Sequence, residues 1–308
     1  MPKIRVGTRG SLLALTQTRA FVADLQAAFP DLEVVEVQIQ TLGDVSTEPL
    51  NKSKTPGLFV SALRDALLKN EVDFIVHSMK DLPAAAFPGI VTACVPKRED
   101  ARDGLVSKGN LTIEELPKGA IIGTSSPRRS AAIVKDRPDL VIEPIRGNVD
   151  TRIEKVRSGH YDATILAMAG LNRIGRGNEV CQIFDLAGFI PAAGQGALSV
   201  ECRTGDTELV EMLATLDNEV DRLCTTAERA VLLGLSAGCA TAIGAIANYQ
   251  NGELTLIAEL GVEETGEFER VTVSQQLKPT EIAIAKLLGL NAAEVLKNSN
   301  IFQKADFS

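Results

Sequence analysis

The first two thirds of the chain alternate between short β-branched runs and segments with a helical period. The expected strands are 4–6, 34–40, 72–76, 90–94, 120–123, 140–145 and 163–166. The expected helices between them are 11–29, 58–68, 127–135 and 149–157. This alternation is typical of α/β domains with largely parallel sheets.

The alternation of predicted strands and helices ends at about residue 219. A helix over 219–233 precedes three strand-like runs, and Asn251-Gly252 between the first two is a strong hairpin signal. The three runs are 243–249, 253–260 and 268–275, and two short helices are expected over 281–288 and 292–297. The pattern predicts a small α+β module with a three-stranded antiparallel sheet. The charged stretch 96–103 is interpreted as a connector between two α/β units.

Composition narrows the function classes. The 308 residues carry a net charge of −8, and Trp is absent. A basic excess and aromatic stacking platforms are therefore missing, which disfavours nucleic-acid binding and membrane binding. The five cysteines are widely spaced without a C-x-x-C pair, so we expect a reducing cytoplasmic location, no disulfide framework and no metal site. We see no secretory signal and no apolar run of membrane-spanning length.

Basic residues gather where predicted strands lead into helices. Gly7–Ser11 contains Arg9, Gly123–Arg129 contains Arg128 and Arg129, and Arg146-Gly147-Asn148 precedes Arg152 by one helical turn. Ser11 and Ser126 suit N-cap positions, and Pro127 suits the first turn of a helix. A helix start offers free N–H groups to anions, and arginine adds bidentate geometry. One such junction is an ordinary solvated helix start, but three built alike favour a polyanionic ligand at the carboxyl edge of a sheet.

Two further segments carry reactive side chains. His77–Asp81 places an acid, a base and a hydroxyl at the end of a predicted strand. The alternative interpretation is that Asp81 caps a helix start and that His77 is a satisfied core histidine. Cys239 lies among small residues in a loop before the strand at 243, where a lone cysteine is usually a small buried hydrophobe.

Read together, these motifs resemble the hydroxymethylbilane synthase family, also called porphobilinogen deaminases. The resemblance rests on TRGSLLAL (8–15), GLF (57–59), HSMKDLP (77–83), GTSSPRR (123–129), RGNVDTR (146–152), ILAMAGLNR (165–173), GQGALSVECR (194–203) and TAERA (226–230). It implies two α/β domains like the halves of a type II periplasmic binding protein, joined by two chain crossings, and a small C-terminal α+β domain. We expect domain 1 over 1–95 and 196–216, domain 2 over 101–192 and domain 3 over 219–308.

The resemblance also implies an activity. Four porphobilinogen molecules are joined head to tail with loss of ammonia, on a dipyrromethane cofactor bound by a thioether to Cys239. Asp81 is the expected catalytic carboxylate, assisted by Arg9 and Lys80. The expected cofactor-binding and substrate-binding residues are Ser11, Asp44, Lys52, Phe59, Ser78, Thr124, Ser125, Ser126, Arg128, Arg129, Arg146, Gly147, Asn148, Arg152, Arg173 and Gln195.

Two positions depart from the family pattern. Pro56 stands where the family often has a lysine before Gly-Leu-Phe, with Lys52 and Lys54 close by in an expected lid loop over 44–56. The polar residues that usually flank the cofactor cysteine are absent around Cys239. The remaining alternative is a non-catalytic carrier of a polycarboxylate, resembling periplasmic binding proteins. We expect a monomer whose partner is the small molecule porphobilinogen.

Overall fold

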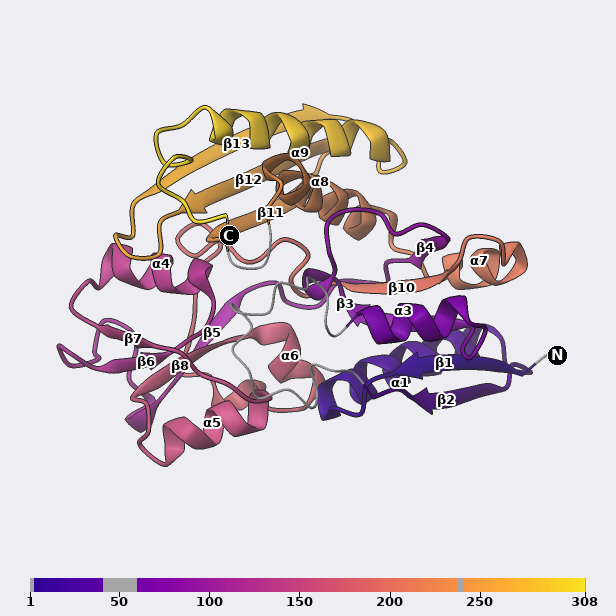
Figure 1. Cartoon of the computed structure of the whole chain (residues 1–308), viewed down its shortest axis with the longest axis horizontal. Helices are drawn as coiled ribbons and strands as arrows, with labels where there is room; N and C mark the ends of the chain where they lie inside the picture. The colour runs from indigo at the N-terminus through magenta and orange to yellow at the C-terminus, as the bar shows by residue number, and fades with distance from the viewer. Residues whose placement is uncertain (1–2, 41–59, 238–240, 308) are drawn as a thin grey trace. The chain divides into compact units, whose positions relative to one another are not determined.

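The computed structural model describes residues 3–40, 60–237 and 241–307. The chain divides into two compact units (Figure 1). The first contains Met1–Glu99 and Ala197–Arg222, and the second contains Asp100–Gly196 and Leu223–Ser308. The C-terminal module thus clusters with the middle α/β region, and its separation as a domain over 219–308 stays a prediction.

A five-stranded sheet with the order β2-β1-β3-β10-β4 forms the centre of the first unit. Its strands are β1 (Ile4–Thr8), β2 (Val34–Gln38), β3 (Phe74–Ser78), β4 (Ile90–Cys94) and β10 (Leu198–Arg203). Its helices are α1 (Leu12–Ala28), α3 (Ser61–Leu68), α7 (Thr207–Ala214) and the 3₁₀ turn η2 (Met79–Asp81). Side chains alternate across β3: Phe74 packs with Phe21 and Leu25 of α1, whereas Ile75 packs with Leu63 of α3. The two helices therefore cover opposite faces of the sheet.

The second unit repeats this plan with the strand order β7-β6-β8-β5-β9. Its strands are β5 (Asp103–Ser107), β6 (Ile121–Gly123), β7 (Val141–Glu143), β8 (Ala163–Ala167) and β9 (Gln182–Ile183). Its helices are α4 (Pro127–Asp136), α5 (Val149–Arg157), α6 (Met168–Arg173) and the 3₁₀ turns η3 (Lys108–Asn110) and η4 (Gly177–Glu179). Leu105, Ile122 and Ile165 are fully buried between the sheet and its helices.

One strand in each sheet runs against the others, and each follows a chain crossing. β5 begins just after the chain enters the second unit, and β10 just after it returns to the first. β10 pairs antiparallel with β3 and β4, and β5 pairs antiparallel with β8 and β9. The remaining strands run in one direction, so the expectation of largely parallel sheets is confirmed. The pattern did not predict β5 or β10, and residues 96–103 are more than a connector because β5 starts at Asp103.

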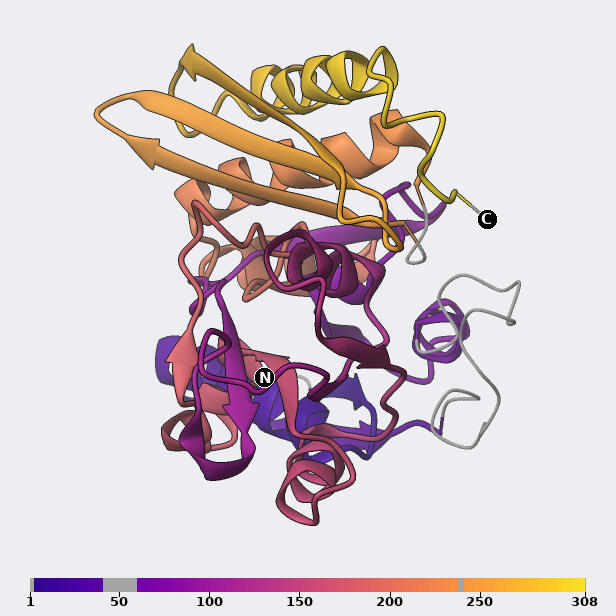
Figure 2. The same ribbon diagram turned by 90° about the vertical axis from the view of Figure 1, so that its left-hand side faces the viewer.

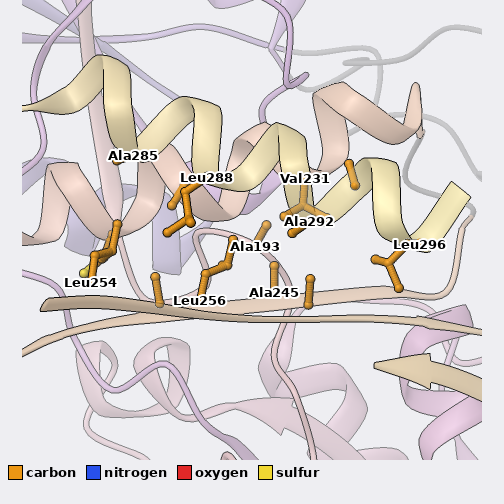
Figure 3. Packing of buried hydrophobic residues seen from close by; sticks show 14 of the residues in the cluster. Ala193, Val231, Ala245, Leu254, Leu256, Ala285, Leu288, Ala292 and Leu296 are labelled. Carbon is orange, nitrogen blue, oxygen red and sulfur yellow. The ribbon is translucent and has the colours of Figure 1, made fainter. Parts of the chain in front are cut away.

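The C-terminal part of the second unit is the predicted α+β module. α8 (Glu219–Leu235) and α9 (Ile282–Lys297) pack on one face of the antiparallel sheet formed by β11 (Ile243–Gln250), β12 (Glu253–Gly261) and β13 (Phe268–Gln276), seen from two sides in Figures 1 and 2. Asn251 and Gly252 both have positive φ in the turn between β11 and β12, which confirms the predicted hairpin. Figure 3 shows Leu254 and Leu256 of β12 beneath the stretch of α9 that carries Ala285 and Leu288.

α9 is one continuous helix where the sequence pattern predicts two. Gly289 lies at its middle, where a Cβ would stand 2.1 Å from the carbonyl oxygen of Ala227 on α8. The glycine is therefore needed for close helix packing, and it does not end the helix. Among the described residues, no helix combines the length and apolarity needed to cross a membrane.

Candidate functional site

In the first unit, the predicted site residues gather where two parallel strands end. β1 and β3 are neighbours in parallel register, so Arg9, which follows β1, and Ser78, the last residue of β3, lie at the same sheet edge. Ser11 caps α1 by accepting a hydrogen bond from the Ala14 backbone nitrogen at 3.3 Å. Gln17 on α1 donates from Nε2 to Ser78 Oγ at 3.0 Å. The hydroxyl groups of Ser11 and Ser78 thus make hydrogen bonds that hold the start of α1 at this sheet edge.

The turn η2 presents the predicted acid and base next to this edge. Met79 is buried beneath the turn, Lys80 is half-buried and Asp81 is exposed. Asp81 is the third residue of the turn, and the cap position is held by Ser78 without a side-chain hydrogen bond. Within the described part of the chain, the Asp81 carboxylate accepts no hydrogen bond and forms no ion pair. The alternative interpretation of Asp81 as a helix cap is therefore wrong, and its carboxylate is available.

His77 lies one residue before this edge, in a buried charged cluster that the sequence did not predict. Arg64 of α3 donates from Nε and Nη2 to the Glu201 carboxylate of β10 at 2.9 and 2.6 Å. His77 Nε2 lies 3.7 Å from Glu201 Oε2 and has no hydrogen-bond partner among the described residues. Burial lowers the pKa of His77 from 6.5 to about 4, helped by the charges of Arg64 and Arg9, whereas Glu201 opposes the shift. His77 is therefore neutral. The alternative interpretation, a core histidine with all its hydrogen bonds made, is wrong because Nε2 has no partner among the described residues.

A neutral buried histidine predicts acid sensitivity. The unfolded chain binds a proton at His77 below pH 6.5, but the folded chain binds it only near pH 4, so stability falls as the pH falls through this window. We expect the unfolding free energy of the wild type to drop by about 2 kcal/mol more than that of His77→Gln between pH 7 and pH 5. Urea titrations at both pH values measure this difference, and equal drops would contradict it.

In the second unit, three parallel strands end at one edge. β7, β6 and β8 lie side by side in parallel register. β6 and β7 lead into two of the predicted basic junctions, and β8 leads into α6, which ends at the predicted site residue Arg173. Ser125 donates from Oγ to the Ile145 carbonyl oxygen at 2.9 Å, joining the junctions after β6 and β7. The Thr124 hydroxyl accepts from the Ser126 backbone nitrogen at 3.2 Å. Ser126 caps α4 in position only, because its side chain makes no hydrogen bond to the helix.

Arg128 and Arg129 are inside the fold, where both bind the carboxylate of Asp103. Their Nη2 atoms each lie 2.7 Å from an oxygen of Asp103, and all three residues are buried. Arg128 Nη1 donates to the Ile190 carbonyl oxygen, and Arg129 Nη1 donates to that of Ile165, both at 2.8 Å. Burial lowers the pKa of Arg128, although the nearby Asp103 counteracts it.

The charge balance of this cluster is positive. Two guanidinium groups share one carboxylate, and Arg129 Nε is buried without a hydrogen-bond partner among the described residues. Gln195 is also buried here and donates from Nε2 to Asp103 Oδ1 at 3.0 Å. A positive cluster with an unused donor suits a carboxylate-bearing ligand.

The junction after β7 holds two arginines, Arg146 and Arg152. The described residues offer the half-buried Arg146 guanidinium no hydrogen bond and no ion pair. Asn148 caps α5 by accepting from the Thr151 backbone nitrogen at 2.9 Å, and Gly147 has a φ of 112° that other residues rarely adopt. Arg152 Nε donates to the Gly147 carbonyl oxygen at 2.9 Å. This turn therefore keeps Arg146 and Arg152 on the same junction.

Two of the remaining predicted residues bind backbone. Arg173, the last residue of α6, donates from Nη2 to the Gly196 carbonyl oxygen at 2.7 Å. Gln195 donates also to the Ala101 carbonyl oxygen at 2.8 Å. Asp44, Lys52, Phe59, the lid loop with Pro56, and Cys239 lie outside the described residues, so their roles stay predictions.

Sequence reasoning missed Asp103, Glu201 and Arg64. The only signal for Asp103 is its place in the charged run before β5, and that run was interpreted as a connector. Glu201 and Arg64 stand among apolar neighbours on a strand and a helix, and charges in such a position usually pair with each other. Among the described residues, no group of His, Cys, Asp or Glu is arranged to hold a metal ion.

Each unit therefore carries one sheet edge, and the two edges differ in chemistry. The first unit offers the available carboxylate of Asp81 beside Lys80 and near Arg9. The second unit offers arginines in the junctions after β6 and β7, and Arg173 at the end of α6. A ligand that carries several carboxylates suits the second edge, and a reaction that develops positive charge suits the first.

Comparisons with known proteins agree along the whole chain. The family model described as "Porphobilinogen deaminase, dipyromethane cofactor binding domain" matches residues 4–211, and "Porphobilinogen deaminase, C-terminal domain" matches residues 222–298. Among curated relatives, porphobilinogen deaminase from Thermobifida fusca is 44% identical and covers 98% of this chain and 94% of its own. Porphobilinogen deaminase from Brevibacillus brevis is 41% identical, and the match covers 97% of this chain and 99% of the relative's own length.

Solved structures of binding proteins also resemble this chain. An arginine-specific periplasmic binding protein from Salmonella typhimurium matches with a TM-score of 0.40 at 11% identity, covering 72% of this chain and 94% of its own. An ancestral cationic amino acid solute binding protein matches with a TM-score of 0.42 at 16% identity, covering 70% and 87%.

Proposed function

The chain belongs to the porphobilinogen deaminase family, and from this premise we propose which of its residues carry each part of the reaction. The protein is a transferase that joins four porphobilinogen molecules head to tail and releases ammonia at each condensation. Growth takes place on a dipyrromethane primer, and hydrolysis then releases linear hydroxymethylbilane for tetrapyrrole biosynthesis. The alternative of a non-catalytic carrier has no support in these findings.

The first proposed assignment concerns the primer. When bound, dipyrromethane supplies a covalently held pyrrole to which the next unit is added. Its acetate and propionate groups fit the arginine-rich edge of the second unit, where the Arg128–Arg129–Asp103 cluster is positive and Arg129 Nε lacks a partner among the described residues. We assign the binding of its carboxylates to Arg146, Arg152 and this cluster, and its attachment to Cys239.

The second assignment concerns Asp81, and one observation carries it. The Asp81 carboxylate is exposed in the turn that follows β3, and the described residues leave it without a hydrogen bond or an ion pair. Loss of ammonia from porphobilinogen leaves a cation, which a fixed carboxylate stabilises electrostatically. The same carboxylate accepts hydrogen bonds from pyrrole N–H groups and can exchange protons with them. Arg9 and Lys80 at the same edge would hold the carboxylates of the incoming molecule.

Replacing Arg146 tests the assignment of the second edge. Arg146→Leu should retain the wild-type melting temperature, because the described residues give its guanidinium no hydrogen bond or ion pair to lose. Loss of one charge-assisted contact to a carboxylate costs about 1.5–3 kcal/mol, so KM for porphobilinogen should rise roughly 10- to 100-fold. Steady-state assays and the intact-mass fraction that carries the primer measure both effects.

Arg157→Leu is the matched control for this experiment. Arg157 is the last residue of α5, with its side chain 57% exposed and paired with Glu179. It should keep the wild-type KM and primer content. Equal KM values in the wild type and Arg146→Leu would exclude Arg146 from the binding site, and a wild type that consumes no porphobilinogen would overturn the function itself.

We also propose a cytoplasmic, monomeric enzyme with no nucleic-acid or membrane partner. The dispersed cysteines support the location, and the acidic overall charge disfavours nucleic-acid and membrane partners. Light scattering after size-exclusion chromatography measures the oligomeric state.

A further inference from the structure

A chain of four alternating charges links α5 to the segment after α6. Arg176 donates from Nη1 to Asp150 Oδ1 and from Nε to Glu179 Oε1, the latter at 2.5 Å. Glu179 Oε2 in turn accepts from Arg157 Nη2 at 2.8 Å. Asp150 and Arg157 are seven residues apart and lie on one face of α5, so this network contacts both ends of the helix.

Asp150 stands in an unusual place for an acidic residue. It lies in the first turn of α5, two residues before Arg152 and four after Arg146, and its side chain is 42% exposed. A helix start attracts carboxylates, and an acidic side chain in the first turn already satisfies part of that attraction. An Asp150 carboxylate without a partner would compete with substrate carboxylates for this positive region. Arg146 is available for such a pairing, because it has no ion-pair partner among the described residues.

Arg176 is held in place beside Asp150 by a second carboxylate. Its side chain is 21% exposed, and hydrogen bonds to Glu179 and Asp150 raise its pKa, so it stays cationic. Glu179, 17% exposed, fixes the guanidinium from the other side. The guanidinium is therefore held in position before it meets Asp150, which makes the ion pair part of a network instead of an isolated surface pair.

We propose that Arg176 is a positioning residue for substrate binding: it neutralises Asp150 and keeps this carboxylate away from the arginines that bind porphobilinogen and the growing chain. This inference rests on the proposed function of Arg146 and Arg152. In this arrangement the Asp150 carboxylate is paired with Arg176 and does not pair with Arg146 or Arg152. The affinity for porphobilinogen at this edge then depends on whether the Asp150 charge is neutralised, and not on a change in the shape of α5.

A set of four variants tests the proposal: Arg176→Gln, Asp150→Asn, the double variant and Arg157→Gln. Arg176→Gln should raise KM for porphobilinogen about three- to tenfold with little change in kcat, as expected for one uncompensated, partly exposed charge. Asp150→Asn alone should leave KM within about twofold of the wild type. The double variant should return to the Asp150→Asn value, because the harmful charge is gone.

Two further measurements separate charge from structure. The intact-mass fraction that carries the primer should fall in Arg176→Gln and recover in the double variant. The KM effect of Arg176→Gln should shrink at 0.5 M salt, where exposed charges are screened over a few ångströms. Arg157→Gln removes the outer ion pair but leaves Asp150 neutralised, so it should match the wild type in KM and primer content.

The outcomes are distinct. If the double variant is as impaired as Arg176→Gln, or if Arg157→Gln is impaired equally, Arg176 supports the structure of α5 and the proposal is overturned. An unchanged KM in Arg176→Gln would also overturn it. A wild type that neither carries the primer nor consumes porphobilinogen would instead refute the proposed function, and the two failures cannot be confused.

Discussion

Asp81→Asn should fold, carry the primer and bind porphobilinogen, yet lose about 10²- to 10⁴-fold in kcat. Asparagine preserves the shape of the side chain but offers no negative charge to the cation that forms when ammonia leaves. Because the described residues make no hydrogen bond or ion pair with the Asp81 carboxylate, its removal should cost little stability. Single-turnover ammonia release, together with the melting temperature, separates the chemical defect from unfolding.

Asp24→Asn provides the isosteric control for Asp81→Asn. Asp24 is exposed near the end of α1, far along the helix from the sheet edge that carries Arg9. It should release ammonia at the wild-type rate. Release by Asp81→Asn within about threefold of the wild-type rate would remove electrostatic catalysis from this carboxylate.

Cys239→Ser should lack the covalent primer and lose nearly all product formation. The wild-type protein should be heavier than its sequence by two porphobilinogen units less two ammonia molecules, and this added mass should vanish in the variant. A serine hydroxyl is not ionised at neutral pH and is a far weaker nucleophile than a thiolate. Intact-mass spectrometry before and after incubation with porphobilinogen measures the difference.

The other cysteines are poor attachment points. Burial raises the pKa of Cys94 to about 12 and that of Cys202 to about 11, and Cys224 is buried in the C-terminal core. Cys181 is partly exposed, so Cys181→Ser is the matched control and should retain the added mass. A wild-type mass equal to that of the bare chain after incubation would refute covalent attachment altogether.

The sequence predicted the parts of the fold that depend on local pattern. β1, β3, β6 and β8 overlap the predicted β-branched runs, with β3 shifted two residues toward the C-terminus, and Asn251-Gly252 forms the expected hairpin turn. β5 and β10 escaped prediction because their place in each sheet depends on partners distant in sequence. Asp103-Gly104 at the start of β5 is typical of a turn until its burial between β8 and β9 is known.

The candidate site residues also fall into those that local sequence patterns predict and those that depend on distant partners. The basic junctions were predictable, because a helix start directly after a strand is a local pattern with a known preference for anions. The interior position of Arg128 and Arg129 was not, because it depends on Asp103 from another strand. The ion pair between Asp150 and Arg176 was not predictable either, because the two residues are 26 positions apart in the sequence.

The position of β10 also bears on the order in which the new chain can fold as it leaves the ribosome. β10 lies between β3 and β4, so these two strands become part of one sheet only after Leu198–Arg203 has been made. At about 5–20 residues per second, the interval between Cys94 and Leu198 lasts on the order of 5–20 s. During that time the facing edges of β3 and β4, including the fully apolar Phe74 and Ile75, lack their native neighbour. The nascent chain is therefore most open to aggregation and to chaperone binding in this interval, and a fragment that ends at Glu99 would lack the strand that completes its sheet.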